Sequence, residues 1–335
     1  MSAQYIVVDI GGTNSRVALC QGAHVKRDSI RRYRNADYPS GLEPVLDDYL
    51  THYPEPVAAI CIDLAGPVQE GIGRLTNLDW VIDAKTLAAR YGAQRVELLN
   101  DMQAQGHALP YLEESSLTPL LEGAQTSGDQ RLVINIGTGL NAAPVLQSQG
   151  RSIVPASEAG HLSLTAVNEE ELRLLDWLAR THPAPGIEDV LSGRGLERLY
   201  GFALHEAGGG AALKAAQILK ALENAEPQAL RAGRLFAGFF GRYASDLALA
   251  SLPHAGIYLV GGVVRHLGPH LMELGFAASF YNKGRFSDLV RQFPVSIVTD
   301  DYAALAGCAG HLAEICFTEG LNLPRMHPAA HNQEL

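Results

Sequence analysis

The feature that most constrains the fold of this chain is an internal repeat with a period of about 126 residues. Segment 8–18 reads VDIGGTNSRVA and lines up with segment 134–144, which reads INIGTGLNAAP. Both segments have the pattern of a strand, a glycine-rich turn and a second strand. This period is too long for a solenoid of stacked repeats. We therefore expect two related halves, each built around one such hairpin.

Short apolar runs alternate with helical periodicity along the rest of the chain, which is typical of an α/β protein. The expected strands include 6–10, 57–64, 95–99, 132–136 and 257–260, and the expected helices include 84–91, 102–108, 169–180, 211–222 and 231–251. A length of 335 residues suggests two domains.

Composition and charge narrow the function classes. The chain carries 26 Lys and Arg against 36 Asp and Glu, a formal net charge of −10, which argues against broad electrostatic binding to nucleic acid or to an anionic membrane. The apolar stretch 247–264 is too broken by proline and glycine to span a bilayer, and the first residues do not form a signal peptide. The four cysteines (Cys20, Cys61, Cys308 and Cys316) show no disulfide or zinc spacing. We expect a cytoplasmic protein that forms a homodimer.

The first glycine-rich turn has the composition of a phosphate-binding loop. The expected ligand-binding residues are Asp9, Gly11, Gly12, Thr13 and Asn14. Glycines let backbone N–H groups approach an anion without obstruction by a Cβ atom, and Thr13 and Asn14 add side-chain donors. A carboxylate at the end of a buried strand is costly unless it faces a cation or a hydrogen-bond network, which a metal-bound water near phosphates would supply. The alternative is an ordinary tight hairpin with a capping Asp.

The second turn, with Gly137, Thr138 and Gly139, supports the phosphate interpretation by repeating it. It also matches the GxGxxA dinucleotide-binding fingerprint, but that loop must open a helix and Pro144 falls within its first turns. Further along, Gly261 and Gly262 follow a buried strand and could let an adenine lie against the backbone, or form a plain strand-to-helix turn.

Other polar residues are candidates for substrate binding. Asn100 and Asp101 follow a strand, where open α/β sheets place ligands. Asp101 could accept a proton from a hydroxyl, or simply cap the next helix. Glu158 and His161 could bind a polyhydroxyl ligand. Glu188 is expected in the first turn of a helix over 187–192, where the helix dipole favours an acidic residue.

Taken together, these motifs resemble the bacterial glucokinase family, within the superfamily of sugar kinases, actin and heat-shock ATPases. The resemblance covers about Tyr5 to Ile315 and keeps the family's order of motifs. Further matching residues are Arg16, Thr76, Asn77, Trp80, Gly160, Ser192, Gly193, Gly195, Leu196, Leu199, Tyr200 and the run 283–286, KGRF.

The resemblance implies ATP-dependent phosphorylation of D-glucose at O6. It implies that Asp101 is the general base and that the two glycine loops bind the ATP phosphates. The residues implied to bind the sugar hydroxyls are Asn77, Asn100, Glu158, His161 and Glu188. Asp9 would contact Mg²⁺ through a water molecule. The implied fold is the two-domain actin-like, ribonuclease H-like α/β fold with a central interdomain cleft. Its small domain would comprise residues 1–111 with 302–335, and its large domain 112–301.

Some positions depart from the family pattern. Asn141, Ser157 and Ala159 stand where glycine is frequent, and Asn135 is another variable position. The phosphoryl donor could also be polyphosphate or ADP.

Two rival functions are compatible with the sequence. One is a kinase for mannose or an aminosugar, although the related ROK branch normally carries a cysteine-rich zinc motif that this sequence lacks. The other is a non-catalytic sugar sensor, which would need a DNA-binding module for which Asp9 leaves no room at the start of the chain.

Overall fold

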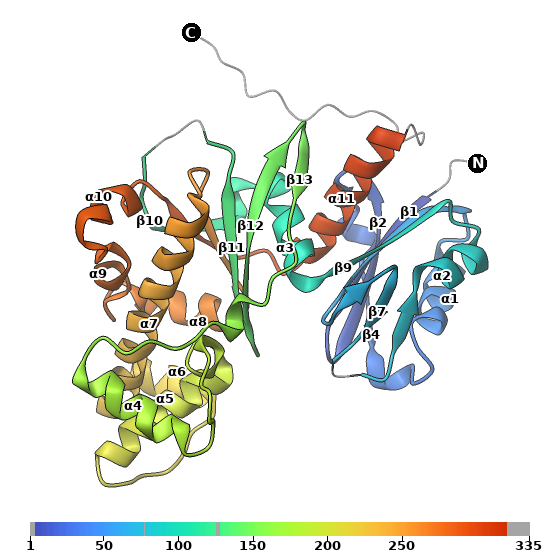
Figure 1. Ribbon diagram of the computed structural model, residues 1–335. Helices are drawn as coiled ribbons and strands as arrows, with labels where there is room; N and C mark the ends of the chain where they lie inside the picture. The colour runs from blue at the N-terminus through green and yellow to red at the C-terminus, as the bar shows by residue number, and fades with distance from the viewer. Residues whose placement is uncertain (1–3, 77, 125–127, 320–335) are drawn as a thin grey trace. The chain divides into compact units, whose positions relative to one another are not determined.

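The computed structural model describes residues 4–76, 78–124 and 128–319. The chain divides into two compact units, Met1–Leu112 with Asp301–Leu335 and Glu113–Asp300. Each unit combines a mixed sheet with helices (Figure 1), so the expected α/β character is confirmed.

The first unit is built on a sheet of order β3-β2-β1-β5-β9, with β4 paired to β2. β1 runs antiparallel to β2 and parallel to β5, and β5 runs parallel to β9. Its elements are β1 (Gln4–Ile10), β2 (Asn14–Gln21), β3 (His24–Val25), β4 (Arg31–Arg34), α1 (Glu43–His52), β5 (Val57–Leu64), β6 (Val68–Gln69), β7 (Ile72–Arg74), β8 (Val81–Asp83), α2 (Ala84–Tyr91), β9 (Arg95–Asn100), α3 (Asp101–Ala108) and α11 (Ala303–Glu319).

Side-chain alternation gives this sheet two buried faces. Ile6 and Val8 of β1 pack in one cluster with residues of α1 and α2, whereas Val7 packs in another with residues of α3 and α11. Figure 1 shows these two pairs of helices on opposite sides of the first sheet. A Cβ on Gly307 of α11 would lie 1.8 Å from the carbonyl oxygen of Ala104, so glycine is required where α11 crosses α3. This close crossing anchors the helix that starts at Asp101.

The second unit repeats the plan with a sheet of order β10-β15-β14-β11-β12-β13. Its elements are β10 (Leu117–Leu121), β11 (Arg131–Ile136), β12 (Leu140–Ser148), β13 (Arg151–Ile153), α4 (Glu169–Ala179), α5 (Gly193–Glu206), α6 (Ala215–Glu223), α7 (Pro227–Ser251), β14 (Ile257–Val260), α8 (Gly262–Leu271), α9 (Phe276–Tyr281), α10 (Ser287–Val290) and β15 (Val295–Val298).

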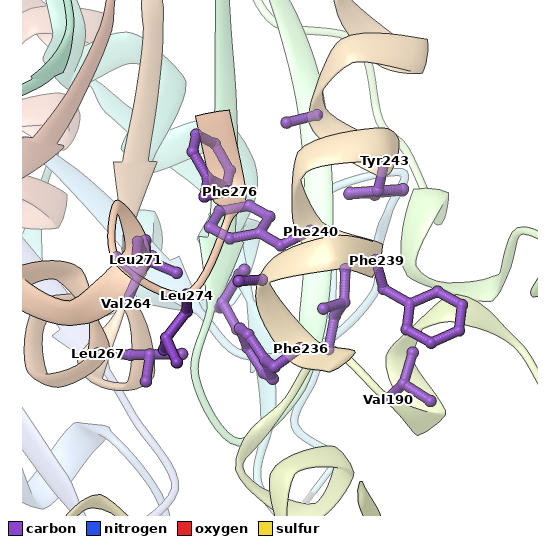
Figure 2. Packing of buried hydrophobic residues seen from close by; sticks show 14 of the residues in the cluster. Val190, Phe236, Phe239, Phe240, Tyr243, Val264, Leu267, Leu271, Leu274 and Phe276 are labelled. Atoms are coloured by element: carbon purple, nitrogen blue, oxygen red, sulfur yellow. The ribbon is translucent and has the colours of Figure 1, made fainter. Parts of the chain in front are cut away.

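The core of the second unit is centred on α7. Figure 2 shows Phe236 and Phe240 of α7 beside Leu274 and Phe276, and Leu267 of α8 belongs to the same buried cluster. Phe240 and Phe276 have ring centroids 5.0 Å apart, in a tilted arrangement that aromatic pairs favour. This packing fixes α8, whose first residue lies in the site described below.

The two units share one strand plan, which confirms the repeated hairpin. In each, a hairpin (β1–β2 or β11–β12) is antiparallel, and its first strand lies parallel to a third (β5 or β14). The strand pairing shows that Asn141 corresponds to Arg16, one residue away from Ser15, to which the sequence alignment matched it. Asp9 pairs with Arg16 and Asn135 pairs with Asn141, because the second turn is one residue shorter than the first.

Two helix boundaries differ from the sequence prediction. The helix expected over 211–222 begins at Ala215, after Gly208–Gly210, whose φ angles of 91°, 119° and 156° are incompatible with a helix. The helix expected from 231 begins at Pro227, since proline is favoured in the first turn of a helix. None of the described helices is long and apolar enough to cross a membrane.

Candidate active site

The first glycine-rich turn is a closed loop between paired residues Ile10 and Ser15. The N–H of Gly11 donates to the carbonyl oxygen of Asn14 at 3.0 Å. Gly12 and Thr13 form the exposed tip. The loop therefore presents its backbone to solvent at the carboxyl end of β1, where an anion can approach it.

Asn35, which follows β4, braces this loop. Its side chain donates to the carbonyl oxygen of Gly11 at 2.8 Å and accepts from the Ser15 hydroxyl at 2.7 Å, and its own N–H donates to the carbonyl oxygen of Thr13 at 3.0 Å. Asn35 is only 2% exposed. Because a single buried residue makes all three bonds, the loop is held in one conformation before any ligand binds.

Asn35→Ala is expected to lower the free energy of unfolding by about 1–3 kcal/mol, since it leaves the buried hydroxyl of Ser15 and the partly buried carbonyl oxygen of Gly11 without their partner. Urea denaturation measures the change. Ser15→Ala removes only one of these bonds and serves as the milder control. Equal stability of Asn35→Ala and the wild-type protein would contradict the bracing role.

A group of charged side chains lies at the same end of the first sheet. Asp9 of β1 pairs in register with Arg16 of β2 and with Asp63 of β5. Arg16 Nη1 donates to Asp9 Oδ2 at 2.5 Å. Because side chains alternate along a strand, Asp9 and Asp63 share the face of Val7 and Cys61, which α3 and α11 cover.

Burial is the main influence on the pKa values of Asp9 and Asp63. Asp63 is 3% exposed, and its Oδ1 has no hydrogen-bond partner among the described residues. Burial raises the pKa of Asp63 well above its usual range, and the carboxylates of Asp9 and Asp101 raise it further. Burial also raises the pKa of Asp9, although the Arg16 guanidinium acts in the opposite direction. An unpartnered buried carboxyl is costly unless it keeps its proton or faces a cation.

The donor set suits Mg²⁺, which is usually held by one or two carboxylates together with substrate phosphates and water. Asp9 and Asp63 supply carboxylate oxygens on neighbouring strands. Within residues 4–76, 78–124 and 128–319, no cluster of three or more His, Cys, Asp or Glu could hold a metal ion.

Asn100 and Asp101 join β9 to α3, and Asn100 is the N-cap of α3. Asn100 Oδ1 accepts from the N–H of Gln103 at 2.8 Å, and Gln103 Oε1 accepts from the N–H of Asn100 at 3.1 Å. Asp101 is the first residue of the helix and accepts from the N–H of Met102 at 2.9 Å. The alternative in which Asp101 is the N-cap is therefore wrong.

The second glycine-rich turn is closed by a backbone hydrogen bond like that of the first turn. Here the N–H of Gly137 donates to the carbonyl oxygen of Gly139 at 2.9 Å. Two helices begin beside it. The N–H of Gly193, at the start of α5, donates to the carbonyl oxygen of Gly137 at 2.9 Å. Gly261, just before α8, has φ +104°, and a Cβ there would lie 2.3 Å from the carbonyl oxygen of Ile136. Helix N-termini favour anions, which strengthens the case for phosphate binding here.

Glu188 lies directly over this second turn. Its Oε2 accepts from the N–H of Leu140 at 2.9 Å and would lie 2.8 Å from a Cβ on Gly139. Arg194 Nη2 pairs with Glu188 Oε1 at 3.4 Å. The helix expected over 187–192 is wrong: only a 3₁₀ turn, Ile187–Asp189, forms, because the chain turns again to place Ser192 as the N-cap of α5.

Glu158 and His161 lie on a 3₁₀ turn that contacts β12. Their side chains are 81% and 72% exposed, with His161 Nε2 and Glu158 Oε2 4.0 Å apart. A Cβ on Gly160 would lie 1.9 Å from the carbonyl oxygen of Leu140, so the turn and β12 meet backbone to backbone. Leu140 thus contacts both the Glu158 turn and Glu188.

The site residues therefore fall into two groups, one in each unit. Asp9, Asn100, Asp101 and the first loop lie at the carboxyl edge of the first sheet. Thr138, Gly262, Glu158, His161 and Glu188 lie around the second turn with its flanking glycines. Asn77 lies outside the described residues, but the hydroxyl of neighbouring Thr76 donates to the carbonyl oxygen of Ala65 just after β5, at 3.2 Å.

Two residues of the first group were missed in the sequence. Asp63 left a signal, because it is the one charged residue in the apolar run 57–64. Asn35 left none, since its role depends on how β4 folds back beside the loop.

The paired glycine hairpins and the α/β architecture are those of the actin-like fold of sugar kinases. The chain belongs to the glucokinase family, whose family model matches residues 6–315. The glucokinase of Erwinia tasmaniensis is 31% identical over 318 residues, covering 94% of this chain and 98% of that protein. The crystal structure of a glucokinase from an Antarctic psychrotroph has a TM-score of 0.85 at 30% identity and covers 94% of this chain and 100% of its own.

A more distant structure shares the fold alone. The ROK family glucokinase from Streptomyces griseus, in complex with glucose and AMPPNP, has a TM-score of 0.58 at 20% identity. It covers 92% of this chain and 98% of its own.

Proposed function

We propose that this protein transfers the γ-phosphoryl group of ATP to O6 of D-glucose, forming ADP and glucose 6-phosphate. The observation that carries the proposal is the position of Asp101, at the end of β9 and on the same sheet edge as the first glycine loop. Membership in the glucokinase family supports glucose as the sugar, and the nucleotide analogue in the Streptomyces griseus complex supports ATP as the donor.

Asp101 acts as the general base in this reaction. The bond between O6 and the γ-phosphorus forms as the bond from that phosphorus to the bridging oxygen of ADP breaks, and the O6 proton passes to the Asp101 carboxylate. A carboxylate is too weak a base to ionise an alcohol early. Asp101 therefore orients O6 first and takes the proton late, since phosphoryl transfer has a loose transition state.

The two glycine loops bind the phosphates of ATP. Gly12 and Thr13 at the exposed tip of the first loop and Thr138 in the second offer N–H and hydroxyl donors. The N-termini of α5 and α8 add their partial positive charge beside the second loop.

Mg²⁺ would be held by Asp9, through water, with Asp63 on the neighbouring strand. When bound, the ion neutralises charge on the phosphates. Arg16 keeps the Asp9 carboxylate oriented through their ion pair.

The sugar hydroxyls are recognised by Asn77, Asn100, Glu158, His161 and Glu188. A site built to pair each hydroxyl discriminates strongly, because an analogue that lacks one leaves a polar group unpaired. The exposed carboxylate and imidazole of Glu158 and His161 are available for this pairing.

We place the reaction in the cytoplasm, where ATP is available. All four cysteines are buried and none forms a disulfide, which is consistent with a reducing compartment.

Coupled ADP release over a panel of hexoses tests the proposal. Glucose with Mg-ATP should give the highest kcat/KM, with turnover of about 1–100 per second. Mannose and N-acetylglucosamine test the rival hexose kinases in the same assay. Formation of glucose 6-phosphate with ADP or polyphosphate in place of ATP tests the other donors. No glucose-dependent ADP release above background would overturn the proposed function.

A further inference from the structure

One carboxamide holds the backbone on both sides of Glu158. Asn141 Nδ2 donates to the carbonyl oxygen of Ser157 at 2.5 Å, and Asn141 Oδ1 accepts from the N–H of Ala159 at 3.0 Å. These two groups belong to the peptide units that flank the Cα atom of Glu158. Asn141 therefore restrains both backbone dihedrals of Glu158, which has φ −124° and ψ 44°.

The direction of the Glu158 side chain depends on this restraint. The side chain is 81% exposed, so packing does little to orient it. His161 lies three residues away on the same turn, with its Nε2 4.0 Å from Glu158 Oε2. The backbone that Asn141 holds therefore sets the direction in which the Cα–Cβ bond of Glu158 leaves the turn.

The same end of β12 also holds the other acidic candidate. The N–H of Leu140 donates to Glu188 Oε2, and the next residue, Asn141, holds Glu158. Asn141 occupies the position that Arg16 occupies in the first hairpin, where the side chain serves an ion pair instead. The strand that leaves the second glycine turn therefore positions both carboxylates.

We propose that Asn141 is a positioning residue for sugar recognition, which fixes the Glu158 carboxylate for a sugar hydroxyl. This inference rests on the proposed glucose kinase activity. Here the side chain of Asn141 supplies a restraint that a glycine at position 141 has no atoms to make.

Asn141→Ala tests the inference. We expect KM for glucose to rise about tenfold, equivalent to about 1.4 kcal/mol, because Glu158 must be ordered when the sugar binds. KM for ATP and kcat should stay within about twofold, since binding lost equally in ground and transition states raises KM alone. Calorimetric binding of glucose should weaken by the same factor.

Gln147→Ala is the matched control. Gln147 lies on the same strand, and its side chain also makes a hydrogen bond, to the Ser152 hydroxyl at 2.8 Å, but this bond closes the β12–β13 hairpin. We expect KM for glucose to be unchanged in Gln147→Ala. Thermal melting of both variants verifies that they fold.

A double-mutant cycle with Glu158→Ala tests whether Asn141 acts through Glu158. Once Glu158 is Ala, adding Asn141→Ala should raise KM for glucose by less than about twofold. An unchanged KM in Asn141→Ala overturns the inference, and so does a tenfold rise that persists in the Glu158→Ala background. Turnover of glucose by the wild-type protein tests the proposed function separately.

Discussion

Asp101→Asn is expected to lower kcat for glucose by about 10²–10⁴-fold, which corresponds to about 3–5 kcal/mol of transition-state stabilisation. An amide can orient the O6 hydroxyl but cannot take its proton. The amide oxygen can still accept from the N–H of Met102, so the first turn of α3 keeps its hydrogen bond. Glucose binding measured by calorimetry should therefore survive largely intact while turnover falls.

Asp83→Asn provides the matched control for this substitution. Asp83 also lies at a helix N-terminus of the first unit, where its carboxylate accepts from the N–H of Lys85 at 2.9 Å to cap α2. Asn is an equally good capping residue. We expect kcat of Asp83→Asn to match the wild type. Unchanged turnover in Asp101→Asn would remove the general base from the mechanism.

The hairpins were predictable because their signals are local. Glycine clusters between apolar runs mark a tight turn wherever they occur, and the repeat of the pattern at Gly11 and Gly137 revealed two related units. The helix over 84–91 was equally local, with Asp83 as N-cap and Gly92 in the left-handed conformation at its end. The one-residue difference between the two turns was not readable from composition, since it depends on hydrogen-bond register.

The arrangement within the site depended on contacts between distant segments. Glu188 had a local explanation as a helix-start residue, yet it lies over the second turn because residues 187–192 bend back toward β12. Asn141 was visible in the sequence as a departure from glycine. Its bonds to Ser157 and Ala159, 16 and 18 residues away, could not be inferred from spacing alone.

Asp63→Asn is expected to stabilise the protein increasingly as the pH rises. Burial raises the pKa of Asp63 in the folded state, whereas the unfolded chain has a value of about 3.9. Between these two pKa values the folded state binds one more proton than the unfolded state. Its free energy of unfolding therefore falls by about 1.4 kcal/mol per pH unit as the pH increases. Asn carries no such proton, so its advantage over Asp63 should grow as the pH rises between these two pKa values.

Urea denaturation of both proteins at pH 5, 6 and 7 measures this difference, and Asp83→Asn again supplies the comparison. The hydrogen bond from the N–H of Lys85 lowers the pKa of Asp83. The Asp83 carboxylate therefore contributes fully to stability at a pH above its pKa in the unfolded chain. This contribution is lost only as the pH falls below about 4. The stability difference for Asp83→Asn should stay constant from pH 5 to 7 while that for Asp63→Asn widens. A constant difference for Asp63→Asn would mean that the Asp63 carboxyl is already ionised at pH 5 in the folded protein, paired with a cation instead of a proton.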